Sequence, residues 1–423
     1  MKFSLKNHIR LDSPFLVAIT IVTIRVLLDY VYLNFVQPSY EYLGFTANPT
    51  AISLIISYAL LIPSIYLVLP YFKYDGLVVS NMVLLLYLIG FVPTTCIIGC
   101  VPQPPLFIVA NAVYWFLILI LPLKINVRNI KLQHVPIGVV ILIGLFFSLI
   151  VIYISGTYAN FRLTLSLENV YEYREQARHF PLSKITTYLW SASRLVLPIV
   201  VSFCLMKKRY LASAYFILVL VLNYSIDGMK STLASLIICL ILFFFVKNDI
   251  KNKYPILILI IIFIALTEYN YMDYSFASDY LLRRNLYFTS IMDTKYFDLI
   301  QETGPRFYSN EVYGKDIAFY VGEDIFNSDG MRANNGLFSD AYMNLGFLGC
   351  LLYPLIYAYL FKLSDSLLRH ANKGLVLLLC LLWAYKMRGT TITTVLLTHG
   401  VFITIVVLAL MPPSRFITNK QSS

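Results

Sequence analysis

The sequence has few charged residues. Of its 423 residues, 13% are Asp, Glu, Lys or Arg and 59% are hydrophobic, and the mean hydropathy is +0.74. Soluble globular domains carry about 25% charged residues, so this composition excludes a soluble globule. It predicts a protein that crosses a membrane several times.

Cysteine and histidine are also scarce, with six and five residues. Nearly all the cysteines fall in apolar runs and none form a C-x-x-C pair, which argues against a disulfide framework or a zinc site. His399 lies in the last apolar run with no carboxylate near it in the sequence. A Ser-His-Asp triad and a zinc cluster therefore have little support. Without internal repeats or low-complexity tracts, we expect a single membrane domain over residues 1–423.

Several acidic residues lie close together in the sequence, namely Glu323, Asp324, Asp329 and Asp340. Residues 327–330 resemble the middle of a calcium-binding loop, but Ile325 and Gly336 occupy its first and twelfth ligand positions. Because these two positions supply the strongest ligands, we expect no metal and no other cofactor here.

Apolar runs recur along the whole chain, at or near the length of about 20 residues that crosses a bilayer as a helix. They cover residues 14–36, 50–72, 77–99, 106–123, 135–155, 186–206, 211–224, 231–246, 255–269, 340–361, 375–385 and 390–411. The sequence therefore predicts an all-α polytopic membrane protein with about 12 transmembrane helices. The first run has span length and no small-residue cleavage site, so we expect a first helix rather than a signal peptide.

The basic residues are distributed unevenly between the two sides that these spans define. With both termini in the cytoplasm, the inner segments hold 18 of the 33 Lys and Arg residues, whereas the short outer loops hold three. Positive charge favours the cytoplasmic side, and anionic lipid accounts for the net charge of +11 without a nucleic-acid partner. We therefore expect the two long polar segments, residues 156–185 and 269–337, to face the periplasm or the cell exterior.

The two long segments hold ten of the remaining basic residues. These are Arg162, Arg174, Arg178 and Lys184 in the first, and Arg283, Arg284, Lys295, Arg306, Lys315 and Arg332 in the second. A chain built of apolar spans rarely keeps a structureless insertion as long as 269–337 without using it. We expect this segment to carry the chemistry, and the two segments to face each other across one site.

Arg174 and Arg178 are four residues apart in the first long segment. A short helix presents both on one side, and such a fork of guanidinium groups suits a diphosphate, whose oxygens arginine binds bidentately. Salt bridges with Glu172 and Glu175 are the structural alternative.

Arg283 and Arg284 are adjacent and stand among apolar and aromatic residues. Neighbouring residues on a helix point about 100° apart, so at most one is expected to reach a given phosphate while the other braces the segment or contacts lipid. Aromatic residues of this region, Tyr287 among them, stack on sugar rings or lie at the bilayer interface.

Ionisable residues also occur inside two apolar runs. Arg25 and Asp29 share a helix face at a spacing of four residues and form either a functional group or a mutually neutralised structural pair. Arg194 has no partner at helical spacing, so we expect it to face a polar cavity or another helix.

Three local patterns carry a resemblance to a known family. They are residues 170–174 (Val-Tyr-Glu-Tyr-Arg), residues 282–288 (Leu-Arg-Arg-Asn-Leu-Tyr-Phe) followed by Tyr-Phe-Asp-Leu from residue 296, and residues 333–349. Together with the layout of the chain, they resemble the Wzy-type O-antigen and capsule repeat-unit polymerases, with the GT-C-like architecture shared by Wzy and ligase membrane glycosyltransferases. The chain departs from the family where a proline-containing turn often follows the arginine pair.

The resemblance implies a glycosyltransferase of the bacterial inner membrane that polymerises undecaprenyl-diphosphate-linked repeat units. It implies that Arg174, Arg283 and Arg284 bind the leaving diphosphate, with Arg162 and Arg178 as weaker candidates. Glu172 or Asp340 is a candidate base for the acceptor hydroxyl, although Asp340 is expected more strongly to cap the helix that begins there, after a turn shaped by residues 334–336. Further substrate-binding candidates are Tyr171, Tyr287 and Asn335. The expected partners are the lipid-linked oligosaccharide, membrane lipids, a chain-length regulator and a flippase.

Two alternatives share parts of this pattern. An O-antigen ligase has a similar architecture and donor, but we expect a histidine in its large outer loop, and residues 269–337 contain none. A flippase for lipid-linked oligosaccharides accounts for Arg25, Asp29 and Arg194 but needs no long outer segment. Inverted repeats with broken helices are the feature that favours transport.

Overall fold

The computed structural model describes residues 13–130, 132–164, 170–245, 250–272, 276–328, 330–333 and 335–412. Within these ranges the chain is almost entirely helical, with one two-stranded hairpin. It divides into two compact units. Unit 1 comprises Met1–Asp75, Val79–Ile125 and Ile250–Tyr359, and unit 2 comprises Gly76–Val78, Asn126–Asp249 and Leu360–Ser423.

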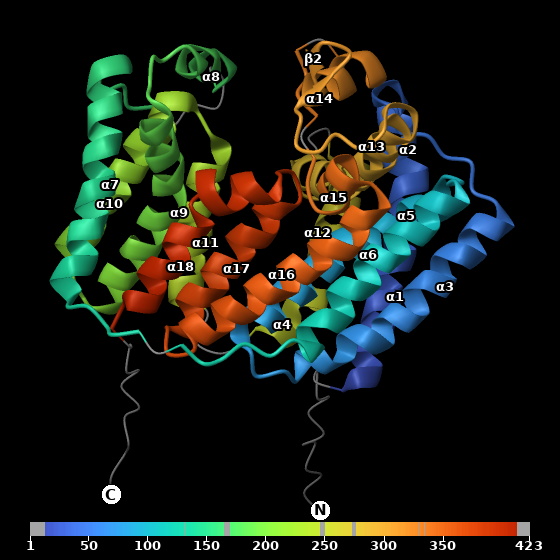
Figure 1. Cartoon of the computed structure of the whole chain (residues 1–423), viewed down its shortest axis with the longest axis horizontal. Coiled ribbons are helices and arrows are strands. Elements are labelled where there is room, and N and C mark those ends of the chain that lie inside the picture. Colours follow the sequence, from blue (N-terminus) through green and yellow to red (C-terminus); the bar gives the residue numbers. More distant parts are fainter. Residues whose placement is uncertain are drawn as a thin grey trace, which may run out of the picture. The chain divides into compact units, whose positions relative to one another are not determined.

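Unit 1 is built around the α4–α5 segment, Leu77–Cys100, in which 94% of the most apolar stretch is buried inside the protein. Helix α5 packs against α1, α3 and α13 (Figure 1). The helices of this unit are α1 (Pro14–Val31), α2 (Gln37–Tyr40), α3 (Ala51–Val68), α4 (Leu77–Leu86), α5 (Val92–Cys100), α6 (Pro105–Lys124), α12 (Tyr254–Tyr271), α13 (Phe288–Thr303), α14 (Ile317–Tyr320), α15 (Phe338–Leu345) and the first part of α16 (Phe347–Leu368).

Local sequence signals set several helix starts in unit 1. Pro14 and Pro105 occupy first-turn positions, where the missing N–H of proline costs nothing. Thr50 and Ser53 form a capping box at the start of α3, each side chain accepting a hydrogen bond from the other residue's backbone N–H. These starts agree with the apolar runs that the sequence predicts.

The segment 269–337 is not the structureless insertion that we expected. It contains a π-helical segment η6 (Ala277–Tyr287), α13, a hairpin of β1 (Glu311–Val312) and β2 (Lys315–Asp316), α14 and a π turn η7 (Val321–Ile325). Many of its apolar residues are buried, and α13 packs onto α15. The prediction failed because residues such as Tyr296 and Phe297 lie in a polar sequence yet form a local core.

Unit 2 is organised around α9 (Lys184–Met206), which contacts most other helices of the unit. These are α7 (Ile137–Tyr158), α10 (Tyr210–Asp227), α11 (Lys230–Phe245), α17 (Lys373–Met387) and α18 (Val401–Leu410), with the short α8 (Val170–Arg178) packed on α10. The π turn η8 (Thr394–Thr398) also contacts α9. Gly400 lies at φ +74, and any Cβ there would meet Ala192 of α9 at 2.6 Å, so only glycine allows this approach.

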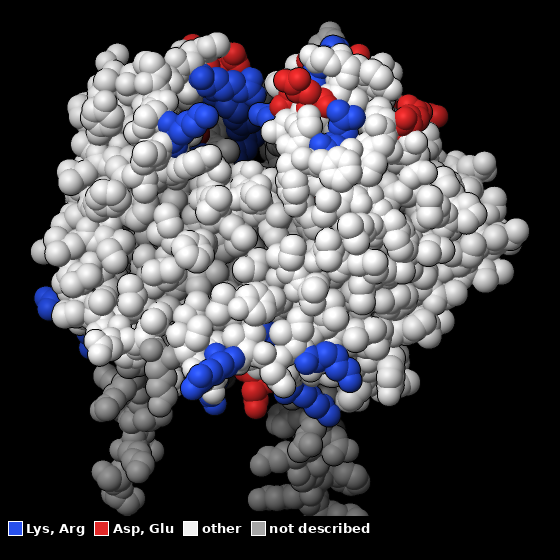
Figure 2. Space-filling view, viewed as in Figure 1, with Lys and Arg blue, Asp and Glu red and all other residues white. Residues whose placement is uncertain are grey.

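Among the described residues, nine helices are long and apolar enough to cross a membrane, and two shorter apolar helices accompany them. The chain is therefore compatible with a multi-pass membrane protein. The run 340–361 is divided at Gly346 between α15 and α16, and the run 390–411 is interrupted at His399 and Gly400 before α18. Within each unit, charged side chains gather towards the ends of the helix bundle (Figure 2).

Candidate functional site

Unit 2 contains a cavity of about 200 Å³ at the end of the bundle that carries α8. It is lined by Arg174, Ala177, Arg178, Thr187, Trp190, Ser191, Arg194, Asp227 and Thr398. The lining comes from α8, the first turns of α9, the end of α10 and η8, and three of its nine residues are arginines.

Helix α8 brings the predicted arginine fork to this cavity. The helix spans Val170–Arg178, and both Arg174 and Arg178 line the cavity, as their spacing predicted. Arg178 Nη1 lies 2.8 Å from Glu175 Oε2, with both side chains more than half exposed. Such an exposed pair stabilises little, so Arg178 can exchange its partner for an anionic ligand.

Arg194 enters the same cavity from α9. Its Nη2 donates to Asp227 Oδ2 at 2.6 Å, and its guanidinium lies 4.7 Å from the centre of the Trp190 ring. The side chains of Arg194 and Asp227 are 12% and 9% exposed. The structure confirms that Arg194 faces a polar cavity and a partner on another helix.

Trp190 and Asp227 are site residues that the sequence analysis missed. The Trp190 indole N–H donates to Asn223 Oδ1 at 2.9 Å, and Asn223 donates in turn to Ser193 Oγ at 2.8 Å, which fixes the ring orientation. The available signal was the four-residue spacing of Trp190 and Arg194, which places them on one helix face. Asp227 gave no such signal, because its partner is 33 residues away.

A further cation of unit 2 lies near this group. The ammonium of Lys386, on α17, interacts electrostatically with Arg194 and Asp227, and its Nζ lies 3.4 Å from Ser231 Oγ. In the sequence, Lys386 falls in the short segment between the predicted spans 375–385 and 390–411. The cavity region therefore combines four cationic side chains with one buried carboxylate and attracts anions.

Two other predicted residues of the first long segment lie outside the cavity lining. Arg162 donates to the backbone oxygens of Ser225 and Ile226 and stacks 3.5 Å from the Tyr173 ring centre, which ties α8 to the end of α10. The exposed Glu172 accepts a hydrogen bond from Gln176 at 3.1 Å instead of pairing with an arginine. The side chain of Tyr171 lies outside the described residues.

In unit 1, the adjacent arginines of η6 have different environments. Arg283 is 8% exposed, forms an ion pair with Asp279 and lies 4.3 Å from the Tyr40 ring centre. Arg284 is 47% exposed, and its Nε lies 3.3 Å from the other oxygen of Asp279. The prediction that only one of the two can reach a ligand agrees with this arrangement, and Arg284 is the accessible one.

A buried carboxylate fixes the start of η6. Glu268, near the end of α12, accepts hydrogen bonds from the backbone N–H groups of Ala277 and Ser278, both at 2.8 Å. A carboxylate at this end of a helix satisfies otherwise unpaired N–H groups and matches the helix dipole. Glu268 therefore sets the position from which Arg284 projects.

Three predicted substrate-binding residues of unit 1 are buried. The Tyr287 hydroxyl donates to the Leu28 backbone oxygen at 2.8 Å, and Asn335 Nδ2 lies 3.3 Å from the Met343 sulfur. Asp340 is 1% exposed and accepts a hydrogen bond from Asn344 at 2.8 Å. These contacts give the three residues roles inside the fold of unit 1.

The prediction that Asp340 caps its helix is wrong. Helix α15 begins at Phe338 after Leu337, whose φ of +53 places it outside the helix, so Asp340 lies within the first turn. The first-turn N–H of Ser339 is satisfied by Asp293 Oδ1 of α13 at 3.2 Å. The cap comes from another helix, which spacing along the sequence does not reveal. Asn334, expected in the preceding turn, lies outside the described residues.

Of the four acidic residues considered as metal ligands, Glu323 and Asp324 are engaged with a cation, whereas Asp340 accepts a hydrogen bond from Asn344. Lys315 Nζ lies 2.9 Å from Asp324 and 3.8 Å from Glu323, and the hydrogen bond with Asp324 raises the pKa of the Lys315 ammonium. Asp316 pairs with Arg332 at 3.2 Å. Asp329 lies outside the described residues.

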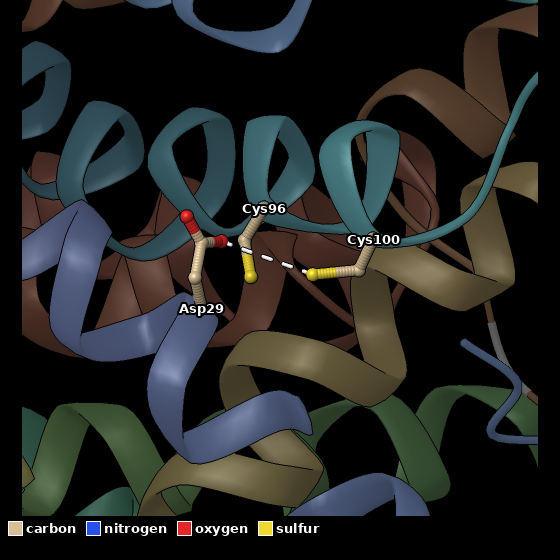
Figure 3. Close-up of side chains that lie close together, drawn as sticks. All are labelled: Asp29, Cys96 and Cys100. Carbon is tan, nitrogen blue, oxygen red and sulfur yellow. Dashed lines mark hydrogen bonds between the residues drawn. The ribbon is translucent and has the colours of Figure 1, made fainter. Parts of the chain in front are cut away.

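A different group of possible metal ligands lies in the core of unit 1, where ligand atoms of Asp29, Cys96 and Cys100 come within 4.8 Å of one another (Figure 3). Asp29 forms an ion pair with Arg25, which also donates to Ser57 Oγ at 2.9 Å. The guanidinium already supplies the positive charge that a cation would bring. The structure thus agrees with the structural alternative for Arg25 and Asp29.

The arrangement in unit 2 has the chemistry of an anion-binding site: arginines from two helices, an oriented tryptophan and one carboxylate. In unit 1, the accessible Arg284 projects from a segment held by the buried Glu268 and by Asp279. No family model, curated protein or solved structure matches the chain.

Proposed function

We propose that this protein is a membrane glycosyltransferase that polymerises undecaprenyl-diphosphate-linked oligosaccharide repeat units into O-antigen or capsular polysaccharide. The observation that carries the proposal is the cationic cavity of unit 2, in which Arg174, Arg178 and Arg194 converge. Its setting among apolar helices suits a substrate whose lipid tail stays in the bilayer.

The cavity fits a diphosphate better than a whole oligosaccharide. Pockets that enclose drug-sized ligands measure about 300–1,000 Å³, and this cavity measures about 200 Å³. When the bond from the sugar to the diphosphate breaks, negative charge grows on the leaving oxygen. Guanidinium groups held on α8 and α9 stabilise that charge without a metal ion.

Arg194 is the anchor of this proposed site. Its ion pair with Asp227 and its contact with Trp190 hold the guanidinium in place before the substrate binds. Arg174 and Arg178, on the short α8, complete the set. The role of Arg284 of unit 1 in binding the diphosphate stays a prediction.

The proposal places the enzyme in the bacterial inner membrane with residues 156–185 and 269–337 on the outer side. A cysteine at Ser309, an exposed residue of the second segment, should then react with an impermeant maleimide in whole cells. A cysteine at Lys208, exposed in a predicted inner loop, should react only after lysis. The native cysteines are buried, which keeps the background low. The reverse labelling pattern would overturn the orientation.

The activity test uses purified protein in liposomes with lipid-linked repeat units from the strain of origin. Arg194→Ala and Arg174→Ala should lower the rate of polymerisation by about 100-fold or more, as expected when a charge-stabilising donor is lost. The polymer ladder should then be reduced to single repeat units. Arg174→Lys should recover little, because an ammonium lacks the bidentate fork.

The matched control is Arg209→Ala, which removes an arginine that does not line the cavity. Its ladder should equal that of the wild type at equal protein. Normal ladders in both cavity variants would refute the proposal.

The ligase and transport alternatives give different products in this assay. A ligase transfers glycan to a lipid A core without lengthening it, and a flippase moves the repeat unit unchanged. The case for transport is weakened because Arg25 and Arg194, which suggested it, each have a carboxylate partner within their own unit.

A further inference from the structure

An exposed tyrosine of unit 1 is held in a backbone conformation that tyrosine rarely adopts. Phe307 and Tyr308 have φ values of +48 and +67, and their side chains are 72% and 55% exposed. For bulky residues, positive φ is a true outlier that persists only where surrounding contacts impose it, and such strain concentrates at functional positions.

The contacts that impose this conformation come from α15. The backbone N–H groups of Arg306 and Phe307 donate to the backbone oxygens of Met343 and Asn344, at 2.8 and 3.0 Å. The N–H of Tyr308 donates to Asn344 Oδ1 at 3.0 Å. Asn344 is itself 2% exposed, so a buried side chain dictates the position of a surface residue.

A chain of hydrogen bonds links the Tyr308 hydroxyl to a buried carboxylate. Asn344 Nδ2 donates to Asp340 Oδ1 at 2.8 Å and to the Tyr353 hydroxyl at 3.3 Å. Tyr353 donates in turn to the Tyr308 hydroxyl at 3.2 Å. Because Tyr308 accepts within this chain, its own O–H is directed to a partner outside it, and the chain polarises that donor.

We propose that Tyr308 is a glycan-binding residue, with its ring against the apolar face of a pyranose and its hydroxyl donating to a sugar oxygen. This inference rests on the proposed function and specifies how the oligosaccharide, as distinct from its diphosphate, is recognised. Exposed Phe307 beside it widens the aromatic surface, while Ser309 and Asn310 supply neighbouring polar groups.

A glycan explains these features better than a lipid contact does. Tyrosines at a bilayer interface need only an amphipathic ring and ordinary backbone. Tyr308 instead combines a strained backbone with a directed donor, and both features fix orientation, which matters for a ligand with many hydroxyl groups. Asn344 acts here as a positioning residue, since it reaches the ligand only through Tyr308.

The test uses saturation-transfer NMR on the full-length protein in nanodiscs. The probe is the repeat-unit oligosaccharide released by mild acid from the lipid carriers of the strain of origin, so it carries no diphosphate. The wild type should transfer saturation to sugar ring protons. Tyr308→Phe should weaken binding about two- to tenfold, the share of one hydrogen bond, and Tyr308→Ala should weaken it further.

The control variant is Tyr271→Ala, which removes a tyrosine that is 85% exposed in the same unit but has ordinary backbone. Its glycan signal should equal that of the wild type. Asn344→Ala should reduce the signal while Tyr308 remains in the chain. If Tyr308→Ala does not fold, Tyr308→Phe still decides the outcome, because it retains the ring.

The proposal would be overturned if the wild type transferred no saturation to the sugar protons. It would also be overturned if the wild type and Tyr308→Phe transferred equal saturation, a result that would leave Tyr308 as a residue that anchors the protein at the bilayer interface. Binding of inorganic pyrophosphate is measured on the same sample. If the wild type binds pyrophosphate and Arg194→Ala does not, the proposal for Tyr308 has failed while the proposed diphosphate site has not. If glycan binds through Tyr308 while the cavity variants still form normal polymer, the proposal for Tyr308 is supported and the proposed role of the cavity is refuted.

Discussion

The arginines of η6 in unit 1 and those of the cavity in unit 2 are arranged in opposite ways. Arg283 and Arg284 are neighbours in the sequence and share one carboxylate, Asp279, yet one is buried and the other is half exposed. Arg174 and Arg194 are 20 residues apart and line one cavity from two helices. Two arginines that are adjacent in the sequence therefore differ in exposure, because neighbouring side chains leave a helix in different directions. Two arginines that are distant in the sequence line the same cavity, because both of their helices pack on α10.

The largest expected effect concerns Asp279, the acid of unit 1 that pairs with the buried Arg283. Asp279→Ala leaves Arg283, at 8% exposure, without the carboxylate that neutralises it. Removing one partner of a buried pair costs about 3–5 kcal/mol, so the melting temperature should fall strongly. The control is Glu175→Ala in unit 2, whose pair with Arg178 is more than half exposed and contributes about 0–1 kcal/mol. Equal melting temperatures for the two variants would contradict the expected difference between the buried pair and the exposed pair.

The next prediction separates the two arginines of η6. Arg283→Ala should lower the melting temperature, since it leaves Asp279 poorly paired in a largely buried position. Arg284→Ala should leave the free energy of unfolding within about 0.5 kcal/mol of that of the wild type and should reduce only the formation of polymer. Thermal unfolding and the liposome ladder, measured on the same preparations, check both. Loss of stability in Arg284→Ala alone would reverse the roles assigned here.

The smallest expected effect is that of metal removal. The cavity of unit 2 supplies positive charge from arginines, and Glu323 and Asp324 of unit 1 are engaged with Lys315. Excess EDTA should therefore leave the rate of the proposed polymerisation unchanged in liposomes. Abolition by EDTA with recovery on adding Mg²⁺ or Mn²⁺ would show that the arginines do not act alone, and would direct attention back to these acids.

Features that depend on residues close together in the sequence could be predicted from the sequence. The spacing of Arg174 and Arg178 predicted a short helix with both on one side, and the isolation of Arg194 predicted a partner elsewhere. Apolar run length predicted the nine helices of span length found among the described residues, with interruptions at Gly346 and His399, while the number of 12 spans stays a prediction. These features depend on helix periodicity and on the cost of charge among apolar groups.

Features that depend on distant contacts could not be predicted. The cap of α15 comes from Asp293, 46 residues before Ser339, so the polar side chain inside the first turn, Asp340, was mistaken for it. Asp227 and Trp190 entered the site through packing of α9 on α10. The second long segment gives no helix signal in the sequence, because its apolar residues are dispersed among polar ones without a run long enough to indicate a core.

The contact between Arg194 and Trp190 allows the cavity to be followed by tryptophan fluorescence. The chain has three tryptophans, and the other two, Trp115 and Trp383, are almost fully buried away from the cavity lining. A guanidinium 4.7 Å from the Trp190 ring is a charge whose displacement shifts the indole emission. An anion that pairs with Arg194 changes the net charge beside the Trp190 ring, so a shift in the emission of this one tryptophan is expected when the cavity is occupied.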